Sequence, residues 1–336
     1  MNRNHLLLSF FISLAPLSTE AQDKPQEEHL QIYLTGDSTD VQTTTRPGLL
    51  LAGGSTDHTN AMRWMLNRSG GGDVVIIRSS GADGYNQYLF DLGKVNSVET
   101  ILINSKTKAE LPIVAEKIRN AEMLFIAGGD QWNYVNYWRN TPVEEAINYL
   151  INTKKVPVGG TSAGCAILGQ FYFSAQYNTI QSNEALESPY HISNAIGRAD
   201  FLQVPILQST ITDSHYSQRK RQGRQFSWLA RLVKEEAIES VRGIGVDEKT
   251  AVAIDEKGWA TVFGSNEAWF VWTQPGTPTV CEPGEPLHWS GKTKPIQAYI
   301  IKGNEKGNGR FNLNNWKDRE GGTIRKFSIN KGKLAD

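Results

Sequence analysis

The sequence is poor in cysteine, and its 336 residues include only Cys165 and Cys281. Two cysteines exclude a framework of several disulfides and leave one bridge at most. Cys165 lies in an apolar stretch of small residues, where a cysteine usually packs as a small apolar side chain. We therefore expect both thiols to be unpaired.

The sequence also has no excess of either charge, because 35 Lys and Arg residues balance 35 Asp and Glu residues. A neutral balance gives no electrostatic reason to expect a nucleic acid or an anionic membrane as a partner. There is no internal repeat. The 39% of hydrophobic residues suffice for a sizeable core in one large domain or two.

A long apolar run is confined to the N-terminus, where Leu6 to Leu17 follows Arg3 and precedes Thr19-Glu20-Ala21. This order predicts a secretory signal peptide over residues 1–21, cleaved after Ala21 and too short for a stable membrane anchor. No cysteine lies near the cleavage point, so we expect no lipid anchor. The mature protein is expected to be secreted or periplasmic.

Beyond the signal peptide we predict a polar lead-in over 22–44, the main domain over 45–302 and a polar, basic C-terminal appendage over 303–336. In the main domain, apolar runs alternate with helical patterns. Continuously apolar runs predict an α/β fold whose mostly parallel sheet is covered by helices on both faces. Four strand-like segments between 242 and 273 are expected to close this sheet as C-terminal β-hairpins.

Three of the apolar runs end in glycine pairs, at Gly53-Gly54, Gly128-Gly129 and Gly159-Gly160. In a parallel sheet these turns share the carboxyl edge, where ligands bind. Ser162 follows the third pair, within Gly-Thr-Ser-Ala-Gly over 160–164. This Gly-x-Ser-x-Gly pattern is typical of a nucleophile elbow, a sharp turn from strand to helix that leaves little room for side chains.

A serine nucleophile needs a base, and His215 is the candidate among six histidines. It lies in the stretch Asp213 to Arg224, between a predicted strand and a helix predicted over 216–237. The alternative is a surface histidine at the start of a basic helix.

Four segments together resemble the cyanophycinases, in the serine peptidase family that also contains dipeptidase E, the aspartyl dipeptidase. They are Gly-Gly-Asp-Gln over 128–131, the elbow over 160–164, Asp-x-His-x-Ser-x-Arg-x-Arg-x-x-Arg over 213–224, and Gly-Ile-Gly-Val-Asp-Glu-Lys-Thr-Ala over 243–251. The resemblance covers roughly 45–273. It implies a class-I-glutaminase-like sandwich, a Ser–His–acid site, and cleavage at aspartyl residues.

The resemblance implies a role for each residue of these motifs. Ser162 is the nucleophile and His215 the base. The N–H groups of Gly129 and Ala163 form the oxyanion site, and Gln131 lines the substrate pocket.

The acid of the site has two candidates. Glu248 matches the glutamate of the dipeptidase by motif, whereas Asp213 is nearer to His215 in sequence. Neighbours two residues apart seldom bond cleanly, so we favour Glu248 and expect Asp213 in the substrate pocket. If neither is the acid, Glu184 and Glu187 in the long loop are the next candidates.

Arg219, Arg221 and Arg224 follow the predicted base within six residues of one another. A guanidinium group can bind a carboxylate through two parallel hydrogen bonds. We therefore expect at least one of these arginines to bind the free carboxylate of an aspartyl substrate. The alternative is a solvated basic face.

Two departures from the family pattern leave the substrate open. Ser214 stands where cyanophycinases tend to carry glutamine, and the loop over 176–200 is long. Both features affect the pocket. The substrate is either a cyanophycin-like β-Asp-Arg polymer or isoaspartyl and aspartyl peptides.

Other classes of function fit less well. An α/β-hydrolase esterase needs a late histidine, for which only His288 is present, and a glutamine amidotransferase needs cysteine at the elbow. A non-catalytic binding module would be expected to lose Ser162 or His215. We expect no cofactor and no metal, and a homodimer is left open.

Overall fold

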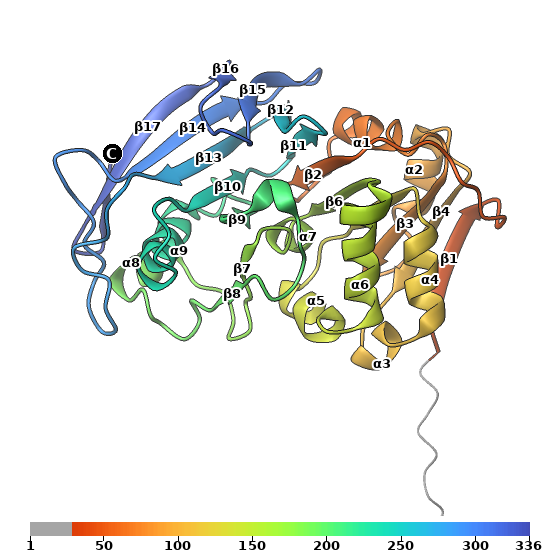
Figure 1. The fold of residues 1–336 in the computed structure, drawn as a ribbon, viewed down its shortest axis with the longest axis horizontal. Coiled ribbons are helices and arrows are strands. Elements are labelled where there is room, and N and C mark those ends of the chain that lie inside the picture. The colour runs from red at the N-terminus through yellow and green to blue at the C-terminus, as the bar shows by residue number, and fades with distance from the viewer. Residues whose placement is uncertain (1–28) are drawn as a thin grey trace, which may run out of the picture.

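The computed structural model describes residues 29–336 and contains two β-sheets with helices packed on them (Figure 1). The first sheet has ten strands. In spatial order they are β1 (Gln31–Gly36), β4 (Ser97–Leu102), β3 (Asp73–Arg78), β5 (Met123–Ile126), β6 (Pro157–Thr161), β2 (Gly48–Ala52), β11 (Thr250–Asp255), β12 (Trp259–Gly264), β15 (Asn308–Asn312) and β16 (Arg319–Glu320).

The five strands from β4 to β2 run parallel, and the strands on either side of them are antiparallel. Leu50 packs in the hydrophobic cluster on one face, and Leu49 and Leu51 pack in the cluster on the other. Because alternate side chains point to opposite faces, a run that is apolar throughout marks a strand buried on both sides. The predicted α/β fold is confirmed.

Helices cover both faces of this sheet. α1 (Thr59–Leu66) and α2 (Asn86–Leu92) pack on one face. The other face carries α3 (Lys106–Ala109), α4 (Pro112–Asn120), α5 (Gln131–Trp138), α6 (Pro142–Tyr149) and its π-helical continuation η1 (Leu150–Lys154). The short helix α7 (Ala163–Ala166) follows β6 directly.

The second sheet has eight strands. In spatial order they are β18 (Lys333–Ala335), β17 (Thr323–Asn330), β14 (Ile296–Lys302), β13 (Glu267–Thr273), β10 (Arg242–Val246), β9 (Thr210–Asp213), β7 (Phe171–Phe173) and β8 (Ile196–Arg198). Among these strands only β7, β9 and β10 run parallel. Helices α8 (Ser182–Glu187) and α9 (Gln222–Glu235) accompany this sheet, and the 3₁₀ turn η2 (Pro205–Leu207) precedes β9.

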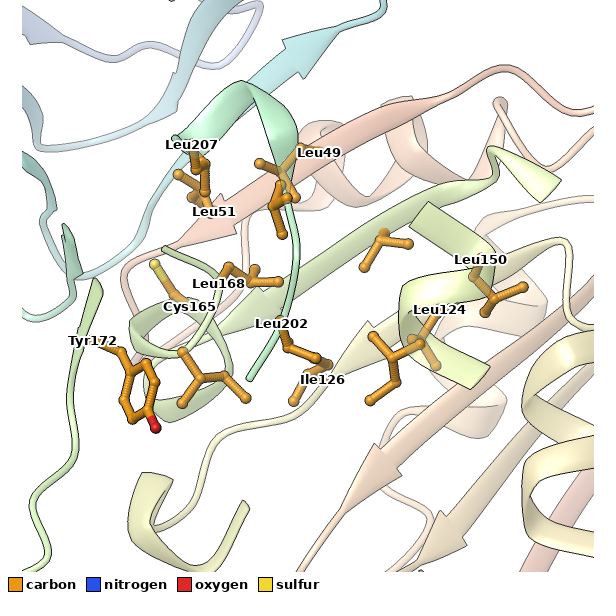
Figure 2. Packing of buried hydrophobic residues seen from close by; sticks show 14 of the residues in the cluster. Leu49, Leu51, Leu124, Ile126, Leu150, Cys165, Leu168, Tyr172, Leu202 and Leu207 are labelled. Carbon is orange, nitrogen blue, oxygen red and sulfur yellow. The ribbon is translucent and has the colours of Figure 1, made fainter. Parts of the chain in front are cut away.

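One hydrophobic cluster joins the two sheets. It includes Leu51 and Leu124 from the first sheet and Val246 and Phe270 from the second. Figure 2 shows part of it, with Cys165 and Leu168 beside Leu51 and Leu207. Cys165 and Cys281 are both buried and unpaired, as expected.

The four predicted hairpin strands do not close one sheet. β11 and β12 extend the first sheet, whereas β10 and β13 belong to the second. The chain therefore crosses from one sheet to the other between Val246 and Thr250. Hydrophobic patterns identify strands but not their partners, and so they did not reveal this crossing.

Helix α9 begins at Gln222 rather than at the predicted residue 216. The segment 215–221 forms turns, in which His215 and Lys220 have φ of 47° and 51°. A right-handed helix cannot accommodate these left-handed residues.

The predicted lead-in and appendage both contribute strands. β1 lies within the lead-in and pairs with β4, and residues 303–336 supply β15 to β18. Phe311 and Trp316 of this last stretch are buried in the cluster between the sheets. Because this stretch is polar and contains several glycines, its sequence showed no clear strand pattern. The predicted signal peptide lies outside the described residues, among which no helix is long and apolar enough to span a membrane.

Candidate active site

Ser162 lies between the end of β6 and the start of α7, with φ 53° and ψ −111°. Such a conformation costs a non-glycine residue about 1–3 kcal/mol, and the surrounding structure must hold it in place. Its N–H donates to Ala52 O at 3.0 Å. The glycines on both sides are needed for space, because a Cβ on Gly160 would lie 2.5 Å from the Gly164 backbone, and one on Gly164 would lie 2.2 Å from Ile126 O.

Three side chains form one hydrogen-bonded chain at this turn. Ser162 Oγ lies 2.8 Å from His215 Nε2, and His215 Nδ1 lies 2.7 Å from Glu248 Oε1. Ser162 follows β6, His215 follows β9, and Glu248 lies where the chain crosses between the sheets. The structure therefore joins residues from both sheets at the carboxyl edge that the sequence indicated.

A turn after β2 holds the histidine in place. His215 N–H donates to Gly53 O at 2.8 Å. A Cβ on Gly54 would lie 2.5 Å from His215 Cε1 and 3.1 Å from Ser162 Cβ, and Gly54 also has a positive φ of 93°. The sequence predicted a glycine turn at the same edge of the sheet as Ser162. The structure shows that Gly54 leaves room for the imidazole beside the serine.

Burial lowers the pKa of His215 below its usual value, and the nearby Arg219 and Arg221 lower it further. The hydrogen bond to Glu248 acts in the opposite direction and raises it. Burial has the largest effect, so the ring is neutral at neutral pH. When Nδ1 donates its proton to Glu248, Nε2 is left as an acceptor that faces Ser162 Oγ.

Two backbone N–H groups beside Ser162 are available to a ligand. Ala163 is the first residue of α7, and the Gly128-Gly129 turn lies so close that a Cβ on Gly128 would be 3.4 Å from Ser162 Cβ. Among residues 29–336, neither Gly129 N–H nor Ala163 N–H has a hydrogen-bond acceptor. Unpaired donors at the start of a helix suit a developing negative charge.

Gln131 is the first residue of α5, after Asp130, whose side chain caps the helix by accepting from Trp132 N–H. Its Nε2 donates to Phe173 O at 3.3 Å, at the end of β7. Gln131 therefore connects the glycine turn after β5 with the second sheet, at the same edge as Ser162.

Asp213 is fully buried but does not bond the histidine. Its two oxygens accept from Arg224 Nε at 2.9 Å and from Nη2 at 2.6 Å, and Arg221 Nη1 lies 3.2 Å from Oδ1. Glu184 caps α8 instead, by accepting from Gln181 N–H. Of the acids considered from the sequence, Glu248 is the one that the structure brings to His215.

The three arginines differ in exposure. The Arg224 side chain is 2% exposed and pairs with Asp213, and the largely buried Arg221 also donates to Ser214 O. The Arg219 side chain is 53% exposed, and its Nε lies 4.0 Å from Glu248 Oε1. Only Arg219 of the three therefore offers a guanidinium group to solvent beside the hydrogen-bonded chain.

The late histidine that an esterase would need lies elsewhere. His288 Nε2 is 3.1 Å from Ser290 Oγ. Within residues 29–336, its buried Nδ1 has no hydrogen-bond partner, and so no carboxylate completes this pair. Within the described part of the chain there is also no group of three or more side chains suited to hold a metal ion.

A serine bonded to a histidine that is itself bonded to a carboxylate, at the strand ends of an α/β sheet, is the arrangement of a serine-type peptidase. The family model described as Peptidase family S51 matches residues 82–262, more than half of the chain. The chain belongs to peptidase family S51.

Several relatives are named cyanophycinase. The chain is 24% identical to the cyanophycinase of Trichormus variabilis over 272 residues, which cover 77% of this chain and 82% of that protein. It is 27% identical to that of Synechococcus elongatus over 230 residues, 65% of this chain and 66% of that protein. A solved structure titled as a putative peptidase E protein from Listeria monocytogenes is 16% identical, with a TM-score of 0.44 over 66% of this chain and 99% of that one.

Proposed function

We propose that this chain is an exported serine peptidase that cleaves peptide or isopeptide bonds at aspartyl residues through an acyl-enzyme. The observation that carries the proposal is the unbroken chain of hydrogen bonds from Ser162 through His215 to Glu248. The assignment of this chain to peptidase family S51 supports peptide hydrolysis as the reaction.

In the proposed mechanism, Ser162 Oγ attacks the scissile carbonyl while His215 Nε2 takes its proton. Glu248 keeps the ring in the correct tautomer and stabilises the imidazolium ion that forms. The N–H groups of Gly129 and Ala163 donate to the negative oxygen of the tetrahedral intermediate. His215 then protonates the leaving amine, and the C–N bond breaks. Water, deprotonated by the same histidine, hydrolyses the ester and frees Ser162.

An exposed guanidinium group beside the hydrogen-bonded chain supports an acidic substrate group. Asp213 pairs with Arg221 and Arg224, and Glu248 bonds His215. Arg219 remains exposed at the edge of the site. We propose that its guanidinium group binds the free carboxylate of an aspartyl unit whose other carboxyl group forms the scissile amide. The names of the relatives favour a cyanophycin-like polymer over isoaspartyl or aspartyl peptides.

The nucleophile is tested with Ser162→Ala, which removes one oxygen atom at a turn and should leave the fold intact. Turnover should fall by several powers of ten, by roughly 10⁶ where the three groups act as a unit. Ser290→Ala is the matched control, because it removes another serine hydroxyl that lies within hydrogen-bond distance of a histidine ring, and it should keep wild-type activity. Activity of the Ser162 variant within about tenfold of wild type would exclude Ser162 as the nucleophile, whereas absence of turnover in the wild-type protein would favour a binding module.

Substrate choice is measured by product analysis. The wild-type protein is incubated side by side with β-aspartyl-arginine polymer, isoaspartyl dipeptides and α-aspartyl peptides. We expect release of fragments that begin or end at an aspartyl residue, and we expect the polymer to be cleaved most rapidly.

Export is tested separately by determining the N-terminal residue of the mature protein, which should be Gln22.

A further inference from the structure

Asp247, the residue before Glu248, is a buried carboxylate that the proposed mechanism does not use. Its Oδ1 accepts from Ser217 N–H at 2.8 Å, and its Oδ2 accepts from Glu267 N–H at 3.1 Å. No ion pair with a cation is found for it among residues 29–336. Burying a carboxylate without a cation costs free energy. The presence of a buried carboxylate at this position therefore points to a role for the two hydrogen bonds that it accepts.

Asp247 reaches from the segment of Glu248 to the turn that follows His215, and Gln218 makes a contact in the reverse direction, from this turn to the segment of Glu248. Gln218 Oε1 accepts from Glu248 N–H at 2.9 Å, although the residue is exposed. At the residue before Ser217, Tyr216 N–H donates to Val246 O at 3.2 Å. Three consecutive residues after His215 therefore bond, in order, to the three residues that end with Glu248.

The backbone of Glu248 is also held on its carbonyl side. Asn266 Nδ2 donates to Glu248 O at 2.9 Å, and Thr250 Oγ1 donates to the same oxygen at 3.1 Å. The acid thus lies on a segment that is fixed at both ends, between the two sheets. The base, by contrast, lies on a turn with positive φ that has no helix or strand of its own.

We propose that Asp247 and Gln218 are positioning residues that tie the turn carrying His215 to the segment carrying Glu248. Only a carboxylate offers two acceptor oxygens to two backbone N–H groups at once. Its bond to Ser217 N–H sets the distance between the two segments, and the Gln218 contact sets their register. The inference rests on the proposed function, because it concerns the geometry of the same site.

The main test is Asp247→Asn, which keeps the shape of the side chain but replaces one acceptor oxygen with a donor. One backbone N–H then faces an NH₂ group, and the two segments should separate slightly. A misplacement of this kind costs up to about 100-fold in rate. We expect kcat to fall roughly 10- to 100-fold, with KM within about threefold of wild type.

The second readout is the titration of His215, followed by NMR, which does not depend on turnover. The groups that influence it are Glu248, Arg219 and Arg221. The bond to Glu248 raises the pKa of His215, so a loosened bond should make the ring titrate at a lower pH than in wild type. If Ser162→Ala keeps activity, the proposed function fails, but this titration still reports whether Asp247 positions the ring.

Gln218→Met provides a variant that should fold normally, because the side chain is exposed. It removes one acceptor and should lower kcat roughly three- to tenfold, with the same direction of shift in the His215 titration. The control is Asp255→Asn at the far end of β11, where Oδ1 alone accepts from both Lys257 N–H and Trp259 N–H at 2.9 Å, so that the substitution removes a charge but keeps the acceptor.

Asp255→Asn should leave both kcat and the His215 titration unchanged. The proposal is overturned if Asp247→Asn and Gln218→Met both keep kcat within twofold of wild type with an unshifted titration. It is also overturned if Asp255→Asn reproduces their effects, because removal of a negative charge anywhere in the fold would then be sufficient.

Discussion

At the scale of single residues, the environment of His215 predicts the pH dependence of the reaction. Burial, Arg219 and Arg221 all lower the pKa of this histidine. The base must be neutral to accept a proton, so activity should be lost only as the pH falls below the ordinary histidine value of about 6.5. The acid limb of kcat/KM should therefore lie below that value.

Removing one of the causes should move this limb in a known direction. Arg219→Ala removes a positive charge that disfavours the imidazolium ion, so the pKa of His215 and the acid limb should rise. Glu248→Gln removes the partner that favours the imidazolium ion, so the residual activity should show a limb at lower pH. Lys220→Ala is the control, because Lys220 is exposed and is not among the groups that shift the pKa of His215. A limb that is unmoved in Arg219→Ala would contradict the electrostatic account.

At the scale of elements, the pair Asp213–Arg224 joins the end of β9 to the first turns of α9. Both side chains are buried, and Arg224 also stacks on the rings of Phe173 and Trp228 at 4.9 Å and 5.0 Å. The pair therefore connects a strand, a helix and the aromatic packing of the second sheet. The sequence suggested substrate binding for both residues, whereas the structure shows that they bond each other.

Arg224→Met should lower the free energy of unfolding by about 3–5 kcal/mol, because it leaves a buried carboxylate without its main partner. The double variant Asp213→Asn with Arg224→Met should lose less than the single variant, since it no longer buries a carboxylate without its main partner. Urea denaturation followed by circular dichroism measures both. Arg119→Met, which breaks an exposed contact of 3.8 Å with Glu145, should change stability by less than about 1 kcal/mol. Equal effects at the buried and exposed sites would contradict this reasoning.

These contacts show what the sequence could predict and what it could not. Continuous apolar runs predicted the parallel strands, because strands buried on both faces tolerate few polar side chains. Glycine spacing predicted the turn at Ser162, because only glycine allows the approach seen at Gly160 and Gly164. The turn over 215–221 was mistaken for helix, because its left-handed residues, His215 and Lys220, carry no local signal for positive φ.

At the scale of the whole molecule, the site exists only where the two sheets meet (Figure 1). Ser162 comes from the first sheet, His215 follows a strand of the second, and Glu248 lies on the crossing between them. Their hydrogen bonds of 2.8 Å and 2.7 Å therefore depend on how the sheets pack. Local sequence does not encode this arrangement, so the partners of strands β10 to β18 could not be predicted from patterns.

Phe311 tests whether residues 303–336 take part in that packing. It lies on β15 of the first sheet and stacks on Phe270 of β13 in the second, with ring centroids 4.2 Å apart and an interplanar angle of 9°. Phe311→Ala removes this contact and leaves a cavity between the sheets. The free energy of unfolding should fall by about 3–5 kcal/mol.

The control is Lys317→Ala, an exposed substitution in the same stretch, which should keep wild-type stability within about 0.5 kcal/mol. Both variants are unfolded in urea and followed by tryptophan fluorescence and by activity. Because the sheets position the site, Phe311→Ala should lose activity and structure at the same, lower urea concentration. If Phe311→Ala unfolds at the wild-type midpoint, residues 303–336 do not contribute to the packing between the sheets.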